Sequence, residues 1–319
     1  MTTFVLVHGA WGGSWGFRLV RRPLREAGHE VFTPSLTGIG ERSHLASPQV
    51  NLSTHVLDVV NTILYEDLAD IVLLGFSYGG MVVTGALEHI ADRVSHLVYL
   101  DAFVPADGQS LDDLARAGYR KAAVGPGATW LVKPPPRPMD DPVATDWAAA
   151  RRSPHPVGCF TEPVTLARPL EGYPFTRTYV KATREPRPAV GGRVSAFWTA
   201  ADHAKTSQDW RYREVDSDHV IAMNRPADLV ALLLELTGAG PARGWSGQPE
   251  ANRAVRSGRA PPGRERRGAR PRCGLRPGAC RRCSPGACAR WPRIRRAAGR
   301  PGHWCARRRP GGADPPAGR

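Results

Sequence analysis

Short apolar runs alternate with longer stretches of mixed polarity along the first 240 residues of the chain. Residues 71–74 are wholly apolar, as expected of a buried strand, and residues 210–215 alternate between apolar and polar. The pattern predicts strands near residues 3–7, 30–34, 70–75, 95–100, 177–182 and 210–215, and helices over residues 14–27, 53–65, 78–90, 195–208 and 226–237. This alternation is typical of α/β proteins, in which helices cover both faces of a mostly parallel sheet.

Residues 105–175 interrupt the alternation of strands and helices. The segment is rich in proline, with three in succession at residues 134–136, and it is longer than an ordinary loop. It follows the predicted strand at 95–100, and ligands of open α/β sheets bind beyond the carboxyl ends of the strands. We therefore interpret it as a lid over a binding site; the alternative is a surface insertion without a functional role.

The composition changes near residue 240. Residues 241–319 contain 21 Arg, no Lys and three acidic residues, which gives them a net charge of +18 and leaves −3 for residues 1–240. Their Val, Leu, Ile, Phe and Met residues are only Val255, Leu275 and Ile294, so this tail cannot bury a core and is predicted to be disordered. We expect one α/β domain over residues 1–240, followed by the tail.

The tail has two interpretations. A sequence rich in Arg, Pro and Gly but without Lys is typical of a GC-rich gene read out of frame, so we interpret the tail as a frameshift product. The alternative is a basic arm that binds nucleic acid, because dense arginine binds phosphate in any sequence context. A zinc pattern is weak because its ligands are irregularly spaced, namely Cys280, Cys283, Cys288, His303 and Cys305. We expect neither nucleic acid nor metal to be bound.

The first residues of the chain and its cysteine content indicate where in the cell the protein is expected. Residues 1–3 lead directly into the first predicted strand, without the basic start or cleavage site of a secretory signal. The body has one cysteine, Cys159, and a domain of its length needs no disulfide. No apolar run is long enough to span a bilayer. We expect a soluble, cytoplasmic protein without a membrane partner.

The segment Gly75-Phe76-Ser77-Tyr78-Gly79 connects a predicted buried strand to a predicted helix. It has the form of a nucleophile elbow, a tight turn that holds a serine in a strained backbone conformation. Glycines flank the serine because side chains there would collide with the strand or the helix. The helix N-terminus favours negative charge developing beside the hydroxyl, so Ser77 is the candidate nucleophile.

Two further segments are predicted to provide the oxyanion donors and the general base that a serine nucleophile requires. The strand at 3–7 leads into a glycine-rich loop, where hydrolases with an elbow place one of two N–H donors for the oxyanion; the residue after the serine supplies the other. The predicted donors are the amides of Ala10 and Tyr78. His219 follows the strand at 210–215, the position of the general base in the chain order serine, acid, histidine.

Residues 1–237 resemble α/β-hydrolases of the group that contains plant hydroxynitrile lyases, plant methylesterases and actinobacterial esterases. The resemblance rests on Val7-His8-Gly9-Ala10-Trp11, on residues 36–43, on the elbow at 75–80 and on Leu100-Asp101-Ala102-Phe103-Val104-Pro105. It implies an α/β-hydrolase fold with a Ser/His/acid triad that includes Ser77 and His219. It also implies no metal and no cofactor, and a small lid over an apolar pocket.

The acid of the triad has two candidates. Glu185 follows the strand at 177–182, where members of this group usually place an aspartate. Asp101 follows the strand at 95–100, and many actinobacterial relatives combine the segment around it with a degraded later loop. Asp216 and Asp218 are too close to His219 in sequence to turn back to its ring. We favour Asp101 and keep Glu185 as the alternative.

Two positions separate the lyases of this group from its esterases. The lyases carry threonine where this chain has Gly9 and lysine where it has Val220, and that lysine stabilises the departing cyanide by its charge. This chain lacks both the threonine and the lysine of the lyases. We therefore expect a serine carboxylesterase that acts through an acyl-enzyme. The alternatives are a lyase of the same group and a non-catalytic binding protein with a basic tail.

The expected substrate is a small apolar or aromatic carboxylic ester. Trp11, in the oxyanion loop, and Trp130, in the segment interpreted as a lid, are predicted to contact it. No other partner is expected, and no pattern in the sequence indicates an oligomeric state.

Overall fold

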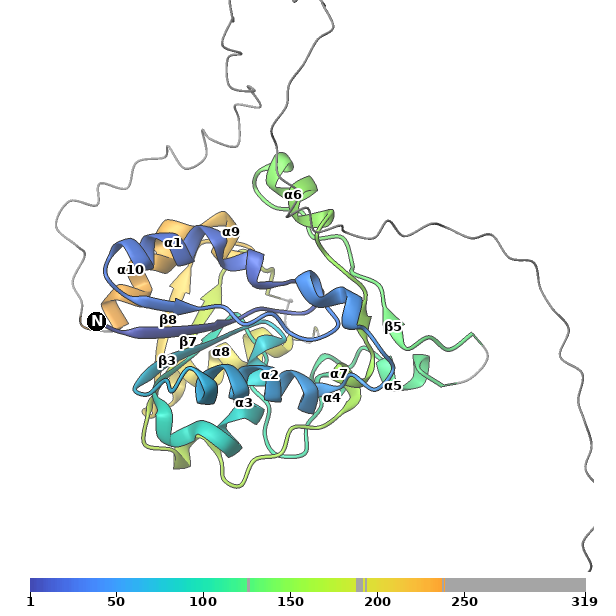
Figure 1. Cartoon of the computed structure of the whole chain (residues 1–319), viewed down its shortest axis with the longest axis horizontal. Helices are drawn as coiled ribbons and strands as arrows, with labels where there is room; N and C mark the ends of the chain where they lie inside the picture. The colour runs from blue at the N-terminus through green and yellow to red at the C-terminus, as the bar shows by residue number, and fades with distance from the viewer. Residues whose placement is uncertain (125–126, 188–191, 193, 237, 239–319) are drawn as a thin grey trace, which may run out of the picture. The chain divides into compact units, whose positions relative to one another are not determined.

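The computed structural model of the chain describes residues 1–124, 127–187, 192, 194–236 and 238. Within these residues, six parallel strands form the main sheet in the order β2-β1-β3-β4-β7-β8 (Figure 1). The strands are β1 (Thr3–Val7), β2 (Glu30–Phe32), β3 (Ile71–Phe76), β4 (Val94–Leu100), β7 (Thr176–Ala182) and β8 (Trp210–Val215). They correspond to the six predicted strands, and the predicted α/β-hydrolase fold is confirmed.

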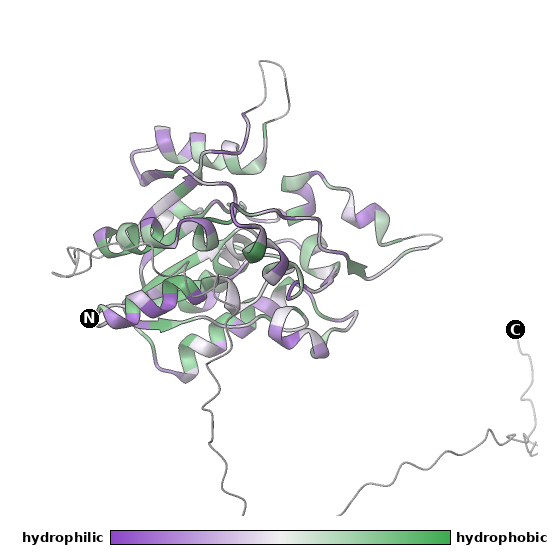
Figure 2. Cartoon of the chain, turned by 90° about the horizontal axis from the view of Figure 1, so that it is seen from above, coloured by the Kyte–Doolittle hydropathy of each residue, from purple (hydrophilic) through white to green (hydrophobic). Residues whose placement is uncertain are grey.

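Helices cover both faces of the sheet. One face carries α1 (Arg18–Glu26), α9 (Ile221–Asn224) and α10 (Pro226–Leu236); the other carries α2 (Leu52–Tyr65), α3 (Gly79–Ile90) and α8 (Ala196–Thr206) (Figure 1). Successive side chains of a strand point to opposite faces. Phe4 and Leu6 of β1 accordingly pack in the core beneath α1 and α10, while Val5 and Val7 pack beneath α2 and α3. Figure 2 shows the hydrophobic residues that gather along these strands.

The predicted helices are present and differ from the structure only near their ends. The first begins as a 3-10 turn, η1 (Ser14–Phe17), before α1, and two more such turns are η2 (Gly40–Leu45) and η3 (Ala91–Arg93). Helix α2 begins with a capping box, in which Asn51 Oδ1 accepts the N–H of Thr54 at 3.0 Å. A cap of this kind stabilises a helix by about 1 kcal/mol, which explains why the start of α2 was visible in the sequence.

The segment at residues 105–175 contains more regular structure than its sequence predicted. Its elements are α4 (Leu111–Ala115), α5 (Tyr119–Ala122), β5 (Leu131–Val132), α6 (Pro142–Ala149), β6 (His155–Pro156), α7 (Gly158–Thr161) and the turn η4 (Leu170–Gly172). Strands β5 and β6 pair in an antiparallel ribbon. Each element is too short to give a periodic pattern of apolar residues, so none was predicted.

The tail at residues 241–319 lies outside the described residues. The predicted disorder, the frameshift interpretation, the basic arm and the cysteine and histidine pattern all fall on that segment. In the part of the chain that the structure describes, no helix has the length and apolar character needed to cross a membrane.

We expect Gly80→Ala to destabilise the protein, although alanine is the better helix former by about 1 kcal/mol. A Cβ at Gly80 in α3 would lie 2.1 Å from the carbonyl oxygen of Phe103, which is backbone and cannot turn aside. Overpacking of this kind costs about 1–3 kcal/mol or more, measured as a lower midpoint of thermal or urea unfolding. Gly172→Ala is the control, because its Cβ would come no nearer than 3.4 Å to a flexible Arg168 side chain. Equal stability of the two variants would contradict the argument.

Candidate active site

Ser77 lies on the turn between β3 and α3. Its φ of 55° is in the left-handed region that residues with a side chain seldom adopt. Its N–H donates to the carbonyl of Leu100 at 3.3 Å, and its own carbonyl accepts the N–H of Phe103 at 3.1 Å. A Cβ at Gly75 would lie 2.6 Å from the carbonyl oxygen of Gly79, so the turn requires glycine there. The turn has the geometry predicted for a nucleophile elbow.

His219 connects Ser77 to an acid. Its Nε2 lies 2.9 Å from Ser77 Oγ, and its Nδ1 lies 2.7 Å from Asp101 Oδ2. Because a carboxylate only accepts hydrogen bonds, Nδ1 carries the proton and Nε2 is left to accept the serine hydroxyl. The rings of Phe76 and Phe197 pack against the imidazole at centroid distances of 4.9 and 4.8 Å. The residues predicted as nucleophile, base and favoured acid thus form one hydrogen-bonded line.

Asp101 is buried directly after β4, with a φ of 41°. Its second oxygen, Oδ1, accepts hydrogen bonds from Lys181 Nζ at 2.8 Å and from the N–H of Ala182 at 3.3 Å. Burial disfavours the charged carboxylate, but the hydrogen bond from His219 and the positive charge and hydrogen bond of Lys181 outweigh burial. The pKa of Asp101 is therefore below its ordinary value, and the group is ionised near neutral pH.

Glu185, the alternative acid, pairs with Lys181 rather than with His219. Its Oε2 accepts a hydrogen bond from Lys181 Nζ at 2.8 Å, and the same nitrogen donates to the carbonyl of Ala182 at 2.8 Å. Lys181 is fully buried in β7, so one ammonium group serves two carboxylates. The sequence analysis missed this lysine. Its signal was a charged residue inside a strand of buried neighbours, where a lysine requires a partner.

His8 fixes the loop that follows β1. Its Nε2 accepts the N–H of Leu36 at 3.2 Å, so its Nδ1 carries the proton and donates to the carbonyl of Gly9 at 3.0 Å. Burial lowers the pKa of His8, which keeps the ring neutral and suits it to these two roles.

The loop at Gly9 passes directly beside the serine. A Cβ at Gly9 would lie 2.9 Å from Ser77 Cβ, so only the absence of a side chain permits this approach. The N–H groups of Ala10 and Tyr78, the predicted oxyanion donors, have no acceptor within the described residues. Both are free to donate to a ligand oxygen near Ser77.

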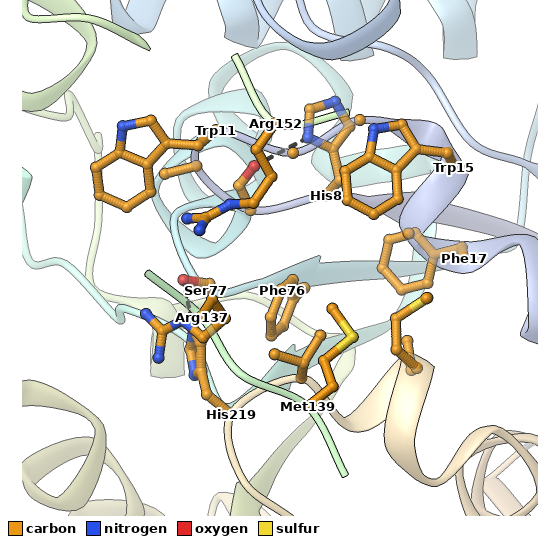
Figure 3. A pocket seen from close by; sticks show the side chains of 18 residues that line it. His8, Trp11, Trp15, Phe17, Phe76, Ser77, Arg137, Met139, Arg152 and His219 are labelled. Carbon is orange, nitrogen blue, oxygen red and sulfur yellow. Dashed lines mark hydrogen bonds between the residues drawn. The ribbon is translucent and has the colours of Figure 1, made fainter. Parts of the chain in front are cut away.

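A pocket opens beside Ser77 and His219. The space within and above it, open solvent included, is about 660 Å³. Its wall is largely apolar (Figure 3), with side chains of Trp11, Trp15, Phe17, Phe76, Met139, Val220, Ala222 and Met223. Two arginines, Arg137 and Arg152, also line it. Three of the lining residues belong to the segment at 105–175, which supports a lid rather than an unrelated surface insertion.

The two predicted substrate contacts have different positions. Trp11 lines the pocket, and its indole N–H donates to the carbonyl of Val132 at 2.9 Å. Trp130 is not among the residues that line this pocket. Its carbonyl accepts the N–H of Val157 at 2.7 Å, next to the β5–β6 ribbon. Its contact with the substrate stays a prediction.

A buried cluster of His55, His155 and Cys159 has the composition of a metal site. However, His55 Nε2 donates to the carbonyl of Thr37 at 2.7 Å, and its Nδ1 accepts the hydroxyl of Tyr78 at 2.9 Å. His155 Nδ1 accepts the N–H of Trp11 at 3.1 Å, so its Nε2 carries the proton. Neither ring keeps a free lone pair for a metal ion. Burial lowers the pKa of His55 to about 3, so that ring stays neutral.

A serine elbow after a central parallel strand, joined to a histidine and a carboxylate at the carboxyl ends of other strands, defines an α/β-hydrolase. Residues 4–233 match the sequence profile of the Alpha/beta hydrolase family, and the chain belongs to that family.

The proteins similar to this chain include three relatives and one solved structure. A carbendazim hydrolyzing esterase from Nocardioides sp. (strain SG-4G) is 42% identical over 181 residues, covering 52% of this chain and 74% of the relative. An alpha-hydroxynitrile lyase and Methylesterase 1, both from Arabidopsis thaliana, are 31% and 34% identical, with each alignment covering 32% of this chain and 40% of the relative. These matches confirm the group identified from the sequence.

Among solved structures, an extracellular alpha/beta-hydrolase from a Paenibacillus species aligns with a TM-score of 0.62 and 23% identity. The alignment covers 76% of this chain and all of that protein. At this identity the likeness supports the fold alone.

We expect Lys181→Met to destabilise the protein by about 3–5 kcal/mol in urea unfolding at neutral pH, because it leaves Asp101 buried without its cation. Asp101 has a lowered pKa in the folded state, so its contribution to stability is present above the unfolded-state pKa of about 3.9 and is lost as pH falls through the folded-state pKa. The difference in unfolding free energy between the wild type and Lys181→Met should therefore become smaller as the pH is lowered below about 3.9.

The control for this experiment is Lys205→Met. Lys205 is exposed and lies 3.6 Å from Glu214, and a surface pair of that kind contributes little. A Lys181→Met deficit no larger than that of the control, or one that does not change with pH, would contradict the role assigned to Lys181.

Proposed function

We propose that the protein is a serine carboxylesterase that acts through an acyl-enzyme. His219 Nε2 takes the proton of Ser77 as Oγ attacks the ester carbonyl carbon, and the amides of Ala10 and Tyr78 bind the resulting oxyanion. His219 then gives the proton to the leaving alcohol. A water molecule, deprotonated by the same nitrogen, releases the acid and restores the serine.

One observation carries this proposal: the continuous line from Ser77 Oγ through His219 to Asp101, with contacts of 2.9 and 2.7 Å. Asp101 holds His219 in the tautomer that can accept a proton and stabilises the imidazolium that forms. Lys181 keeps this carboxylate ionised but does not reach the serine, so it acts as a positioning residue.

The comparisons support an ester as the substrate class. A relative that covers about half of this chain at 42% identity is named a carbendazim hydrolyzing esterase, and another relative is a methylesterase. The pocket wall adds that the part of the substrate beside Ser77 is apolar or aromatic and small.

A lyase reaction is the second candidate, because an alpha-hydroxynitrile lyase is also similar to part of the chain. Gly9 opposes it, since a side chain there would lie 2.9 Å from Ser77 Cβ and 3.1 Å from the Phe76 ring. Val220 also lines the pocket without a charge. Arg137 and Arg152 supply positive charge elsewhere in the pocket, so the argument from Gly9 is the stronger of the two.

We expect the protein to hydrolyse short-chain p-nitrophenyl esters without added metal, and Ser77→Ala to abolish nearly all turnover because the nucleophile is gone. The measurement is p-nitrophenol release, repeated with a chelator, alongside cyanide release from mandelonitrile. Substantial activity in Ser77→Ala, or its loss to the chelator, would refute a serine mechanism. Cyanide release comparable with ester turnover would favour the lyase.

We expect Asp101→Asn to lower kcat by about 10⁴-fold on the same ester, because an amide permits the wrong histidine tautomer. Glu185→Gln is the matched control: it also replaces a carboxylate that binds Lys181, but it does not touch His219. It should retain most of the activity. The reverse order of the two variants would make Glu185 the acid.

A further inference from the structure

The two arginines of the pocket come from the segment at 105–175. Arg137 lies between β5 and α6, and Arg152 lies between α6 and β6. In the view of Figure 3, both guanidinium groups lie on the same side of the pocket as the Ser77 hydroxyl. Neither residue was singled out by the sequence analysis, because arginines in a proline-rich loop resemble ordinary surface residues.

Arg137 has no hydrogen bond and no ion pair within the described residues. Arg152 donates to the carbonyl of Pro135, and its guanidinium lies 5.7 Å from the centroid of the Trp11 ring. No carboxylate of the described residues pairs with Arg152 either. The pocket therefore has two cations without a partner anion.

The acids nearest to Arg137 are already engaged. Three carboxylates influence the pKa of Arg137 through their charges, without a hydrogen bond to it, namely those of Asp218, Asp101 and Glu185. Asp101 binds His219 and Lys181, Glu185 binds Lys181, and Asp218 Oδ1 accepts hydrogen bonds from the N–H of Val220 at 3.2 Å and from the Asn224 amide. No side chain of the pocket wall is acidic. A ligand is the remaining source of negative charge on the pocket side.

The positive charges also act on one another. Burial lowers the pKa of Arg137, and burial together with the charge of Arg137 lowers the pKa of Arg152 to about 10. Both groups remain protonated near neutral pH. Arg137 is exposed and Arg152 is half-buried, and the two like charges line one pocket. An anion between them would reduce their repulsion, and a carboxylate matches the planar donor pattern of a guanidinium.

We propose that Arg137 and Arg152 bind an ionised carboxylate on the substrate, so that the preferred esters are monoesters of dicarboxylic acids. The ester group lies at Ser77 and the apolar spacer lies among the aromatic and methionine side chains. The free carboxylate lies at the two arginines. This inference rests on the proposed esterase function and specifies its substrate class.

The test compares monomethyl esters of succinate, glutarate and adipate with matched esters in which a primary amide replaces the free carboxylate. The three chain lengths vary the separation between the ester group and the free carboxylate. For at least one length, we expect kcat/KM of the wild-type protein to favour the anionic ester by about 10- to 100-fold, since hydrogen bonds to charged groups have this worth. The preference should appear mainly in KM and weaken at high salt.

Arg137→Gln, Arg152→Gln and the double variant should each reduce the ratio of anionic to amide kcat/KM, with the largest loss in the double variant. Arg211→Gln is the control, because it removes the same charge from an exposed residue of the edge strand β8 outside the pocket. Its ratio should equal that of the wild type.

Each outcome decides for or against the proposal. The absence of a wild-type preference for the anionic ester at all three lengths, or arginine variants that change both ester types equally, would overturn it while leaving the esterase function intact. Loss of the preference in the control as well would show a general effect of net charge, which also overturns it. Failure of the wild-type protein to cleave any ester, p-nitrophenyl esters included, would instead refute the proposed function.

Discussion

The left-handed backbone of Ser77 is the constraint on which the rest of the site depends. Such a conformation costs about 1–3 kcal/mol in a residue with a side chain, and the surrounding structure must offset it. Here the serine is held between the carbonyl of Leu100 and the N–H of Phe103, both at the end of β4. A Cβ at Gly79 would lie 2.6 Å from the carbonyl oxygen of Val7. The elbow therefore locks the ends of β1, β3 and β4 against one another, and each supplies part of the site.

A chain of buried charge extends this rigid centre toward the edge of the sheet. His219, Asp101, Lys181 and Glu185 follow one another through contacts of 2.7 to 2.8 Å across β4, β7 and the loop after β8. Removal of one member leaves another charge buried without a partner, which is strongly destabilising. The intact chain itself contributes little net stability. The chain fixes the position of Asp101, because this carboxylate cannot move without also moving Lys181. Asp101 in turn orients the His219 ring.

The elbow, the sheet and the histidine could be predicted from the sequence because each depends on residues that are close together in the chain or on their order. Glycine spacing identified the elbow, alternating apolar runs identified the sheet, and chain order identified His219. The acid stayed ambiguous between Asp101 and Glu185 because the choice depends on which carboxylate reaches the histidine, a contact between separate strands. The β5–β6 ribbon beside Trp130 was not predicted, because it pairs two-residue strands that leave no periodic signal. Arg137 and Arg152 were missed because arginines in a proline-rich loop resemble ordinary surface residues.

The backbone of Trp11 joins the oxyanion loop to the segment that covers the pocket. Its N–H donates to His155 at 3.1 Å and its carbonyl accepts the N–H of Ser153 at 3.2 Å, while the preceding residue, Ala10, carries a predicted oxyanion donor. These hydrogen bonds tie residues 153–155 of the segment at 105–175 to the backbone next to the predicted oxyanion donor. If Ala10 acts as proposed, changes in residues 153–155 would affect the rate of the chemical step as well as access to the pocket.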